Sequence, residues 1–368
     1  MKTSPLEVLE KLNEASYEAY IVGGYVRDYL RGKISLDIDI TTSAKPIEVK
    51  NVFKEDTITC RNYLSMILYY KDLKCEITSF RKEDDYHNNR HPEKIEYISN
   101  LYQDLLRRDF TMNTICMDRK GNIIDLLNGE EDIKNKLIKS VGDPDKKLKE
   151  DALRILRAVR FATTLDFSLD DNLKEAIINN KSLVRKLSFS RKKEELELIF
   201  SSPNIDKGIK LLKEFGLDKE LEIYNLDKIF KSLDIISVWA SLNFSSKYPF
   251  SKNERKLIDK LRCLVKEDLS NKFILYNSDA YLLSLAADMK NIDKNKVLNL
   301  YESLPIHNRK DIKVSSEKII KLLNKDKGGP FIEKVYSDLE NAIINGTLIN
   351  KEKDINKYIL ERRDKYEG

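Results

Sequence analysis

The sequence of 368 residues has few of the residues that build zinc centres, disulfide frameworks or membrane spans. Its four cysteines show no Cys-x-x-Cys spacing, and three histidines are too few for a zinc site or a His-Asp phosphohydrolase. No stretch approaches the ~18 consecutive apolar residues of a membrane helix, and the polar start has no secretion signal. These absences exclude several hydrolase classes and predict a reduced, cytoplasmic protein.

Charge is abundant but nearly balanced, with 35% charged residues and a net charge of +5. Residues 1–140 contain 22 Lys and Arg against 24 Asp and Glu, which leaves 44 against 37 for residues 141–368. The basic excess therefore belongs to the C-terminal part, which favours a polyanion held by one region and processed by another. With 41% hydrophobic residues, the chain is long enough for two or three domains.

A pair of acids near the N-terminus is the first candidate for chemistry. In residues 36–40, Asp37 and Asp39 alternate with aliphatic residues, so a strand there would present both carboxylates on one face. Like charges that close repel each other unless a cation lies between them, and carboxylate oxygens suit Mg²⁺. The common alternative for Asp-x-Asp is a solvated strand face.

A glycine pair precedes these acids. Residues 23–28 read Gly-Gly-Tyr-Val-Arg-Asp and follow a predicted strand at residues 19–22. Gly24 would let backbone N–H groups approach a phosphate, and Arg27 adds charge on the first turn of a predicted helix. Gly-Gly alone is most often a turn, but a phosphate-binding turn beside a metal site is the minimum for phosphoryl or nucleotidyl transfer.

The next segments are predicted as a strand pair and a loop. Strands at residues 65–70 and 74–80 would flank a turn, and Glu76 could reach the same metals as a third carboxylate or face water at a sheet edge. Residues 81–102 are polar and lack periodicity, which predicts a mobile loop. A last short strand is expected at residues 122–127.

Two further stretches carry arginines. Residues 107–113 read Arg-Arg-Asp-Phe-Thr-Met-Asn, and such paired guanidinium groups suit triphosphate oxygens, although paired arginines are more often solvated. From about residue 142 the chain is predicted to be helical. Between residues 151 and 162 the polar positions recur every three residues and predict a narrow stripe lining a cleft: Asp151, Arg154, Arg157 and Arg160.

The Asp151 and Arg154 pair matches two bases. Cytosine and adenine both present an amino donor beside a ring-nitrogen acceptor. Asp can accept a hydrogen bond from the amino group, and Arg can donate one to the ring nitrogen. Guanine and uracil would be mispaired there, at ~1 to 3 kcal/mol per group. The alternative is an intrahelical ion pair without a ligand.

Together these motifs resemble the class II tRNA nucleotidyltransferases, which are the bacterial and eukaryotic CCA-adding enzymes and the related bacterial poly(A) polymerases. The order Gly-Gly-x-Val-Arg-Asp, Asp-x-Asp-x-Thr-Thr, Arg-Arg-Asp-Phe-Thr-x-Asn and Glu-Asp-x-x-Arg carries the resemblance. It continues into residues 304–311 and 346–350, so it covers nearly the whole chain.

The resemblance implies a role for each candidate residue. Asp37 and Asp39 would hold Mg²⁺, with Glu76 as the third acid, and Asp151 and Arg154 would be an amino-acid template for the incoming base. The remaining nucleotide-binding residues would be Gly24, Arg27, Arg108, Arg157 and Arg160. The implied reaction is a two-metal transfer from CTP and ATP to the tRNA 3′ end, without a nucleic-acid template.

The implied fold class is α+β, with a mixed β-sheet head followed by all-α neck, body and tail domains. The expected limits are residues 1–140 for the catalytic head, 141–200 for the neck, 201–290 for the body and 291–368 for the tail. The body and the tail together are expected to bind tRNA. The oligomeric state is left open between monomer and homodimer.

Two departures from the family pattern stand out. Lys147-Leu148 replaces a usual Arg-Phe, and Ser190-Arg191 replaces a usual Glu-Arg, so Arg191 is expected to brace the helix at residues 151–162 with another partner. The loop at residues 81–102 fits the full-length family pattern, which predicts addition of all three nucleotides or of the terminal A alone. A poly(A) polymerase and a catalytically silent RNA-binding protein remain the rival interpretations.

Overall fold

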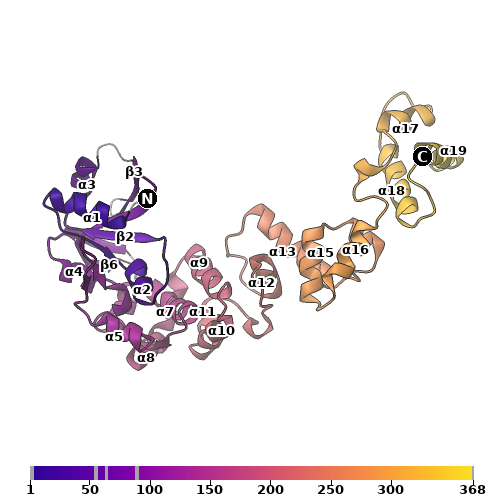
Figure 1. Cartoon of the computed structure of the whole chain (residues 1–368). Helices are drawn as coiled ribbons and strands as arrows, with labels where there is room; N and C mark the ends of the chain where they lie inside the picture. Colours follow the sequence, from indigo (N-terminus) through magenta and orange to yellow (C-terminus); the bar gives the residue numbers. More distant parts are fainter. Residues whose placement is uncertain (1–3, 54–56, 63–64, 88–90, 367–368) are drawn as a thin grey trace. The chain divides into compact units, whose positions relative to one another are not determined.

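The computed structural model describes residues 4–53, 57–62, 65–87 and 91–366, without the side chains of residues 57–62, 83–87 and 91–95. Figure 1 shows the chain, which divides into two compact units. The first comprises residues 1–233 and 242–249, and the second comprises residues 234–241 and 250–368. No helix among the described residues is long and apolar enough to cross a membrane.

The first unit opens with a seven-stranded mixed sheet. Its strand order is β3-β4-β5-β2-β1-β8-β9, with β2 parallel to β5 and antiparallel to β1. Its strands are β1 (Ala19–Val22), β2 (Ile38–Thr42), β3 (Thr57–Asn62), β4 (Ser65–Tyr70), β5 (Leu73–Ser79), β8 (Cys116–Met117) and β9 (Ile123–Ile124). The helices of the sheet region are α1 (Pro5–Glu14), α2 (Gly24–Leu30), α3 (Pro46–Val52), α4 (Leu101–Leu106) and α5 (Gly129–Lys134).

Local sequence explains the first of these elements. Ser4 caps α1 through a reciprocal pair of hydrogen bonds with Glu7. Pro5 stands at the first helical position, where a backbone N–H would have no partner within the helix, so its absence costs nothing. Val8, Leu9 and Leu12 lie at helical spacing and are fully buried. The helix and strands predicted at residues 5–15, 19–22 and 65–70 are confirmed.

Two predictions in the sheet were wrong. β2 begins at Ile38, so Leu36 and Asp37 belong to the preceding loop, and Leu36 is exposed. The described residues 81–87 and 91–97 are no loop but a two-stranded antiparallel sheet of β6 (Arg81–His87) and β7 (His91–Tyr97). These strands pair through their backbones and have no clear apolar face. Their sequence therefore shows no hydrophobic alternation from which strands could be predicted.

Helices dominate the rest of the first unit. β10 (Leu137–Ile138) pairs in parallel with β11 (Ser168–Leu169), which joins the sheet region to the helices that follow. These are α6 (Pro144–Glu150), α7 (Leu153–Thr164), α8 (Asp171–Asn180), α9 (Phe189–Phe200), α10 (Ile205–Glu214) and α11 (Leu217–Glu220). α7 packs against α9 and α10, and buries Ile155, Leu156 and Val159 completely.

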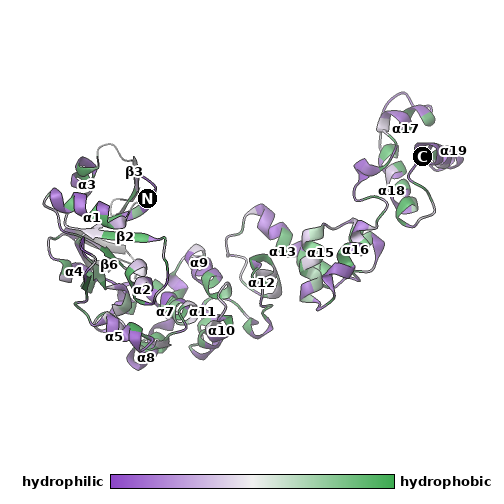
Figure 2. Ribbon diagram, viewed as in Figure 1, coloured by the Kyte–Doolittle hydropathy of each residue, from purple (hydrophilic) through white to green (hydrophobic). Residues whose placement is uncertain are grey.

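The second unit is helical throughout its described residues. Its helices are α12 (Ile235–Ser241), α13 (Lys252–Leu264), α14 (Lys272–Tyr276), α15 (Ala280–Met289), α16 (Lys294–Glu302), α17 (Ser316–Leu322), α18 (Phe331–Ile344) and α19 (Glu352–Glu361). Figure 2 shows hydrophilic and hydrophobic stretches side by side on these helices, as expected for amphipathic helices around a core. Val335, Leu339 and Ile355 lie at the centre of one such core. The predicted α+β class, a mixed sheet followed by helices, is confirmed.

Candidate active site

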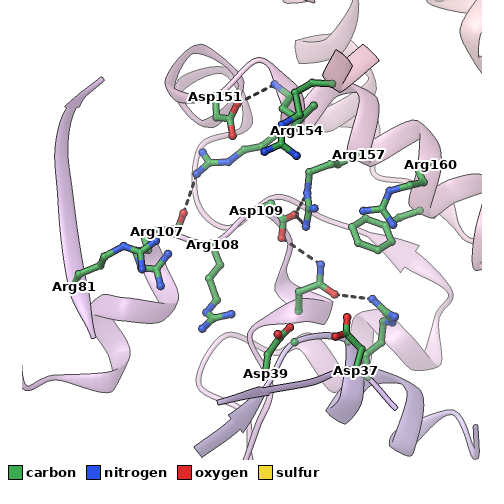
Figure 3. Close-up of a pocket in the computed structure, with 17 residues that line it drawn as sticks. Asp37, Asp39, Arg81, Arg107, Arg108, Asp109, Asp151, Arg154, Arg157 and Arg160 are labelled. Carbon is green, nitrogen blue, oxygen red and sulfur yellow. Dashed lines mark hydrogen bonds and ion pairs between the residues drawn. The ribbon is translucent and has the colours of Figure 1, made fainter. Parts of the chain in front are cut away.

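A pocket of about 650 Å³ opens in the first unit between the sheet and α7. Figure 3 shows Asp37 and Asp39 on one side of it and Arg154, Arg157 and Arg160 on the other. Nine of the ten predicted site residues line it, and Glu76 does not. Eight further residues line it: Gly23, Arg81, Arg107, Asp109, Asn113, Leu153, Phe161 and Arg191.

Asp37 and Asp39 point into this pocket from the edge of β2 (Figure 3). Asp39 stands in register with Glu76 on the parallel neighbour β5. Burial and the charges of Asp37 and Glu76 raise the pKa of Asp39 to about 6, against the opposing charges of Arg108 and Arg157. This repulsion among carboxylates favours a bound cation.

The donor set fits Mg²⁺ better than a metal that needs an all-protein cage. Among the described residues, no three carboxylate, imidazole or thiolate side chains converge on one metal position. Glu76 therefore lies beside Asp39 without completing a three-ligand site. Mg²⁺ is commonly held by one or two carboxylates together with substrate phosphates, and Asp37 and Asp39 supply that number.

The glycine turn approaches the same carboxylates. Gly23 has a φ of +78°, and a Cβ atom there would lie 3.3 Å from Oδ2 of Asp39. Both facts favour glycine, because L side chains rarely adopt such a φ and a Cβ atom would crowd the carboxylate. The turn thus brings backbone close to the metal-binding edge.

A hydrogen-bonded chain links this turn to α7. Nη1 of Arg27 donates to Oδ1 of Asn113 over 2.9 Å, and Nδ2 of Asn113 donates to Oδ1 of Asp109 over 3.2 Å. Nε of Arg157 then donates to Oδ2 of Asp109 over 2.7 Å. Burial would raise the pKa of Asp109, but the charge of Arg157 and the hydrogen bonds from Arg157 and Asn113 lower it to about 2.

Asp109 and Asn113 are thus connecting residues that sequence reasoning missed. Both lie inside the motif at residues 107–113, so their motif membership was the available signal. Their partners lie 48 and 86 residues away along the chain, which no local pattern reveals.

The expected Asp-Arg pair on one helix is wrong in its geometry. α6 ends at Glu150, Asp151 has extended backbone, and α7 begins only at Leu153. Oδ1 of Asp151 accepts a hydrogen bond from the backbone N–H of Leu153 over 3.0 Å. Asp151 therefore lies in the junction between two helices, still facing the pocket beside Arg154 (Figure 3).

Arg154 is held by the ends of two helices. Its guanidinium donates to the backbone carbonyls of Lys147 and Arg107, each over 2.8 Å, and to Glu150 over 2.9 Å. Cations stabilise helix C-termini by binding these otherwise unpaired carbonyls. The contacts fix the orientation of Arg154 at the pocket wall.

The other stripe arginines gather around one aromatic ring. Arg160 donates to Glu195 of α9 over 2.6 Å, and its guanidinium lies 3.9 Å from the centroid of Phe161. Arg27 and Arg157 each lie 5.3 Å from the same ring. Several positive groups are therefore fixed in one polar pocket, which suits a polyanionic ligand.

Arg108 is oriented by Asp104, a fully buried carboxylate of α4. Nη2 of Arg108 lies 3.3 Å from Oδ2 of Asp104, and Nε of Arg107 donates to Oδ1 over 2.9 Å. The buried Nε of Arg108 has no hydrogen-bond partner among the described residues. An orphaned donor in an open pocket is a group that a substrate oxygen can satisfy.

The two sequence departures have local explanations. Nζ of Lys147 donates to the carbonyl of Leu106 over 2.6 Å and so ties α6 to the end of α4. Arg191 pairs with Glu194 on its own helix, whereas Glu195 holds Arg160 of α7. The expectation that Arg191 braces this helix was therefore wrong.

Comparison with protein families gives the class. Residues 19–139 match the poly(A) polymerase head domain, residues 166–222 match the RNA- and SrmB-binding site of polymerase A, and residues 240–359 match tRNA nucleotidyltransferase domain 2. A head of this kind, with its carboxylates facing an arginine-lined pocket, defines a nucleotidyltransferase.

Within that class, the chain belongs to the family of CCA-adding enzymes. It is 33% identical to the CCA-adding enzyme of Geobacillus sp. (strain WCH70) and 32% identical to that of Lactobacillus johnsonii, over 97% of this chain and 96% of each relative. The solved structure of the Bacillus stearothermophilus CCA-adding enzyme in complex with CTP matches 99% of both chains at a TM-score of 0.85 and 26% identity.

Proposed function

We propose that this protein adds cytidine, cytidine and adenosine to the 3′ end of tRNA, from CTP and ATP and without a nucleic-acid template. The carboxylate pair of Asp37 and Asp39 facing an arginine-lined pocket carries this proposal. Relatives along the whole chain are CCA-adding enzymes, and one with 26% identity was solved with CTP. We place the reaction in the cytoplasm.

In the proposed reaction, the 3′ oxygen of tRNA attacks the α-phosphorus of the bound nucleotide. A new P–O bond forms, the bond to pyrophosphate breaks, and the 3′ hydroxyl loses its proton. Mg²⁺ held by Asp37 and Asp39 would lower the pKa of that hydroxyl and stabilise the leaving pyrophosphate. Glu76, opposite Asp39 in the sheet, adds to the negative charge that attracts the metal.

Different residues of the pocket would bind different parts of the nucleotide. Gly24 and Arg27 lie at the turn and suit the triphosphate, as does the orphaned donor of Arg108. Arg157 and Arg160 supply further fixed charge at the wall of α7.

Base selection is assigned to Asp151 and Arg154. A carboxylate accepts from the amino group of cytosine or adenine, and a guanidinium donates to the neighbouring ring nitrogen. Arg154 is held by two carbonyls and Glu150, so its orientation is set before the base arrives. Preorganised partners of this kind penalise uracil and guanine.

One assay separates this function from its rivals. The protein is incubated with tRNA transcripts that end before the first C, after one C and after both, with each nucleotide triphosphate offered alone and in combination. A CCA-adding enzyme extends all three transcripts to the same end. An A-adding enzyme extends only the CC-ended transcript, and a poly(A) polymerase, which the head-domain match keeps as second candidate, adds long A tracts.

Absence of any product would favour a non-catalytic RNA-binding protein and overturn the proposal. Binding of labelled tRNA in a gel-shift experiment, run on the same samples, shows that the protein is folded and tells inactivity from misfolding.

A further inference from the structure

Two large apolar side chains stand in solvent immediately before Asp37. Ile34 is 95% exposed and Leu36 is 87% exposed, in the loop that joins α2 to β2. Two hydrogen bonds order the loop backbone. The N–H of Lys33 donates to the carbonyl of Asp28 over 2.8 Å and ties the start of the loop to α2, and that of Asp37 donates to Oγ of Ser35 within the loop over 3.3 Å. The exposure of Ile34 and Leu36 thus belongs to a loop with local hydrogen bonds.

This loop reaches the nucleotide pocket only through Asp37. Asp37 and Asp39 line that pocket, whereas Ile34 and Leu36 do not. The groups suited to a triphosphate, Arg27 and Arg108, lie within it. Because the attacking oxygen and the leaving pyrophosphate stand roughly in line on opposite sides of the α-phosphorus, the primer must approach from beyond the triphosphate. Leu36 directly precedes Asp37, so the exposed loop lies next to the carboxylate near which the 3′ oxygen must arrive.

Chain geometry limits how far these side chains can lie from the reaction. The Cα atoms of Leu36 and Asp37 are ~3.8 Å apart, and Ile34 lies at most ~11 Å from Asp37 along the extended chain. Asp37 would hold the metal, which would then lie next to this loop. A nucleoside whose 3′ oxygen is near that metal therefore has its base within reach of both side chains.

We infer that Ile34 and Leu36 form an apolar seat for the base of the 3′-terminal nucleotide of the tRNA primer. This role rests on the proposed function and is one of positioning. Each base has an apolar face, so such contact tolerates any base, whereas hydrogen-bonded readout would discriminate. A CCA-adding reaction presents three different primer ends in turn, which requires that tolerance. Lys33 lies beside the seat and suits the adjacent phosphate.

Steady-state kinetics test the seat. The double variant Ile34→Asn/Leu36→Asn should lower kcat/KM for CC-ended tRNA about tenfold, with the KM for ATP unchanged, because the lost contact is apolar area on the primer alone. Ile34→Leu/Leu36→Met should restore the value. Leu233→Asn is the matched control, since Leu233 is 89% exposed and does not line the pocket. Unchanged kcat/KM for tRNA in the double variant, or an equal loss in the control, would overturn the inference.

A crosslinking experiment needs no turnover. Benzoylphenylalanine replaces Leu36 in the full chain, CC-ended tRNA is added, and the adduct is mapped after irradiation. Adducts on the last two nucleotides are expected. Adducts confined to the remainder of the tRNA, or to a second protein chain, would contradict the seat, whether or not the unmodified protein incorporates nucleotides. The proposed function itself is judged separately by incorporation.

Discussion

The ion pairs of the nucleotide pocket and those of the C-terminal helices differ in burial. In the pocket, Arg154 and Glu150 are 8% and 17% exposed, and Arg160 and Glu195 are 15% and 10% exposed. In the second unit, Lys318 and Glu352 are 44% and 64% exposed. Solvated ion pairs contribute little to the stability of the folded protein. Removing one partner of a buried pair, in contrast, leaves an uncompensated buried charge. Charges in the pocket are therefore fixed in direction, whereas those of an exposed pair such as Lys318 and Glu352 are not.

The largest effect is expected where the pocket charges meet the reaction. Asp39→Asn should lower incorporation of labelled CTP and ATP by at least ~10³-fold, because metal-assisted charge stabilisation contributes several kcal/mol to such reactions. tRNA binding should persist, since it does not depend on this carboxylate. Near-normal incorporation by Asp39→Asn would end the metal assignment, and Asp37→Asn is the companion test.

The next effect concerns the stability of the connecting chain. Asp109→Asn removes the carboxylate that Arg157 and Asn113 both bind, and it leaves the mostly buried Arg157 without its partner. The free energy of unfolding, from urea denaturation, should fall by ~2–3 kcal/mol, because Asp109 is largely buried while Arg157 is 33% exposed. A change below ~1 kcal/mol would show that water replaces Asp109 at little cost, and the contrast between the two regions would weaken.

Base selection should respond less strongly. Asp151→Ala or Arg154→Ala removes one of two hydrogen-bonding partners of the base, so discrimination against UTP and GTP should relax about 10- to 100-fold. The measurement is kcat/KM for each nucleotide triphosphate with CC-ended tRNA. If the ratios among the four triphosphates stay constant while overall activity falls, these residues orient the helix junction and do not read the base.

A smaller effect depends on pH. The pKa of Asp109 is about 2 in the folded protein, below its ordinary value of 3.8. Below about pH 4, Asp109 binds a proton more readily in the unfolded chain than in the folded protein. The contribution of its carboxylate to the free energy of unfolding is therefore present above about pH 4 and disappears as the pH falls towards 2. The stability difference between the unchanged protein and Asp109→Asn should be constant from pH 5 to 8 and shrink by about 2 kcal/mol in acid.

The smallest effect is expected on the helices of the second unit. Glu352→Gln removes one member of the exposed pair with Lys318, whose nitrogen and oxygen atoms are 3.8 Å apart. The midpoint of urea denaturation should stay within experimental error, because exposed pairs are screened and hold their side chains loosely. A marked loss would mean that this region too depends on fixed charges.

Sequence alone determined the elements whose information is local. α1 and β4 follow from capping, apolar spacing and alternation, and Asp37 and Asp39 meet because they stand only two positions apart along the chain. Nine of the ten site residues predicted from the motifs also line the pocket. These features need no partner from elsewhere in the chain.

Tertiary structure alone decided the partners. Asp109 meets Arg157, Glu195 meets Arg160, and Asp39 stands opposite Glu76, across 48, 35 and 37 residues. It also placed Asp151 in a helix junction and paired β6 with β7. The physical reason is that a charge buried on folding must be satisfied by whichever group the fold brings near it, and hydrophobic periodicity contains no record of that group.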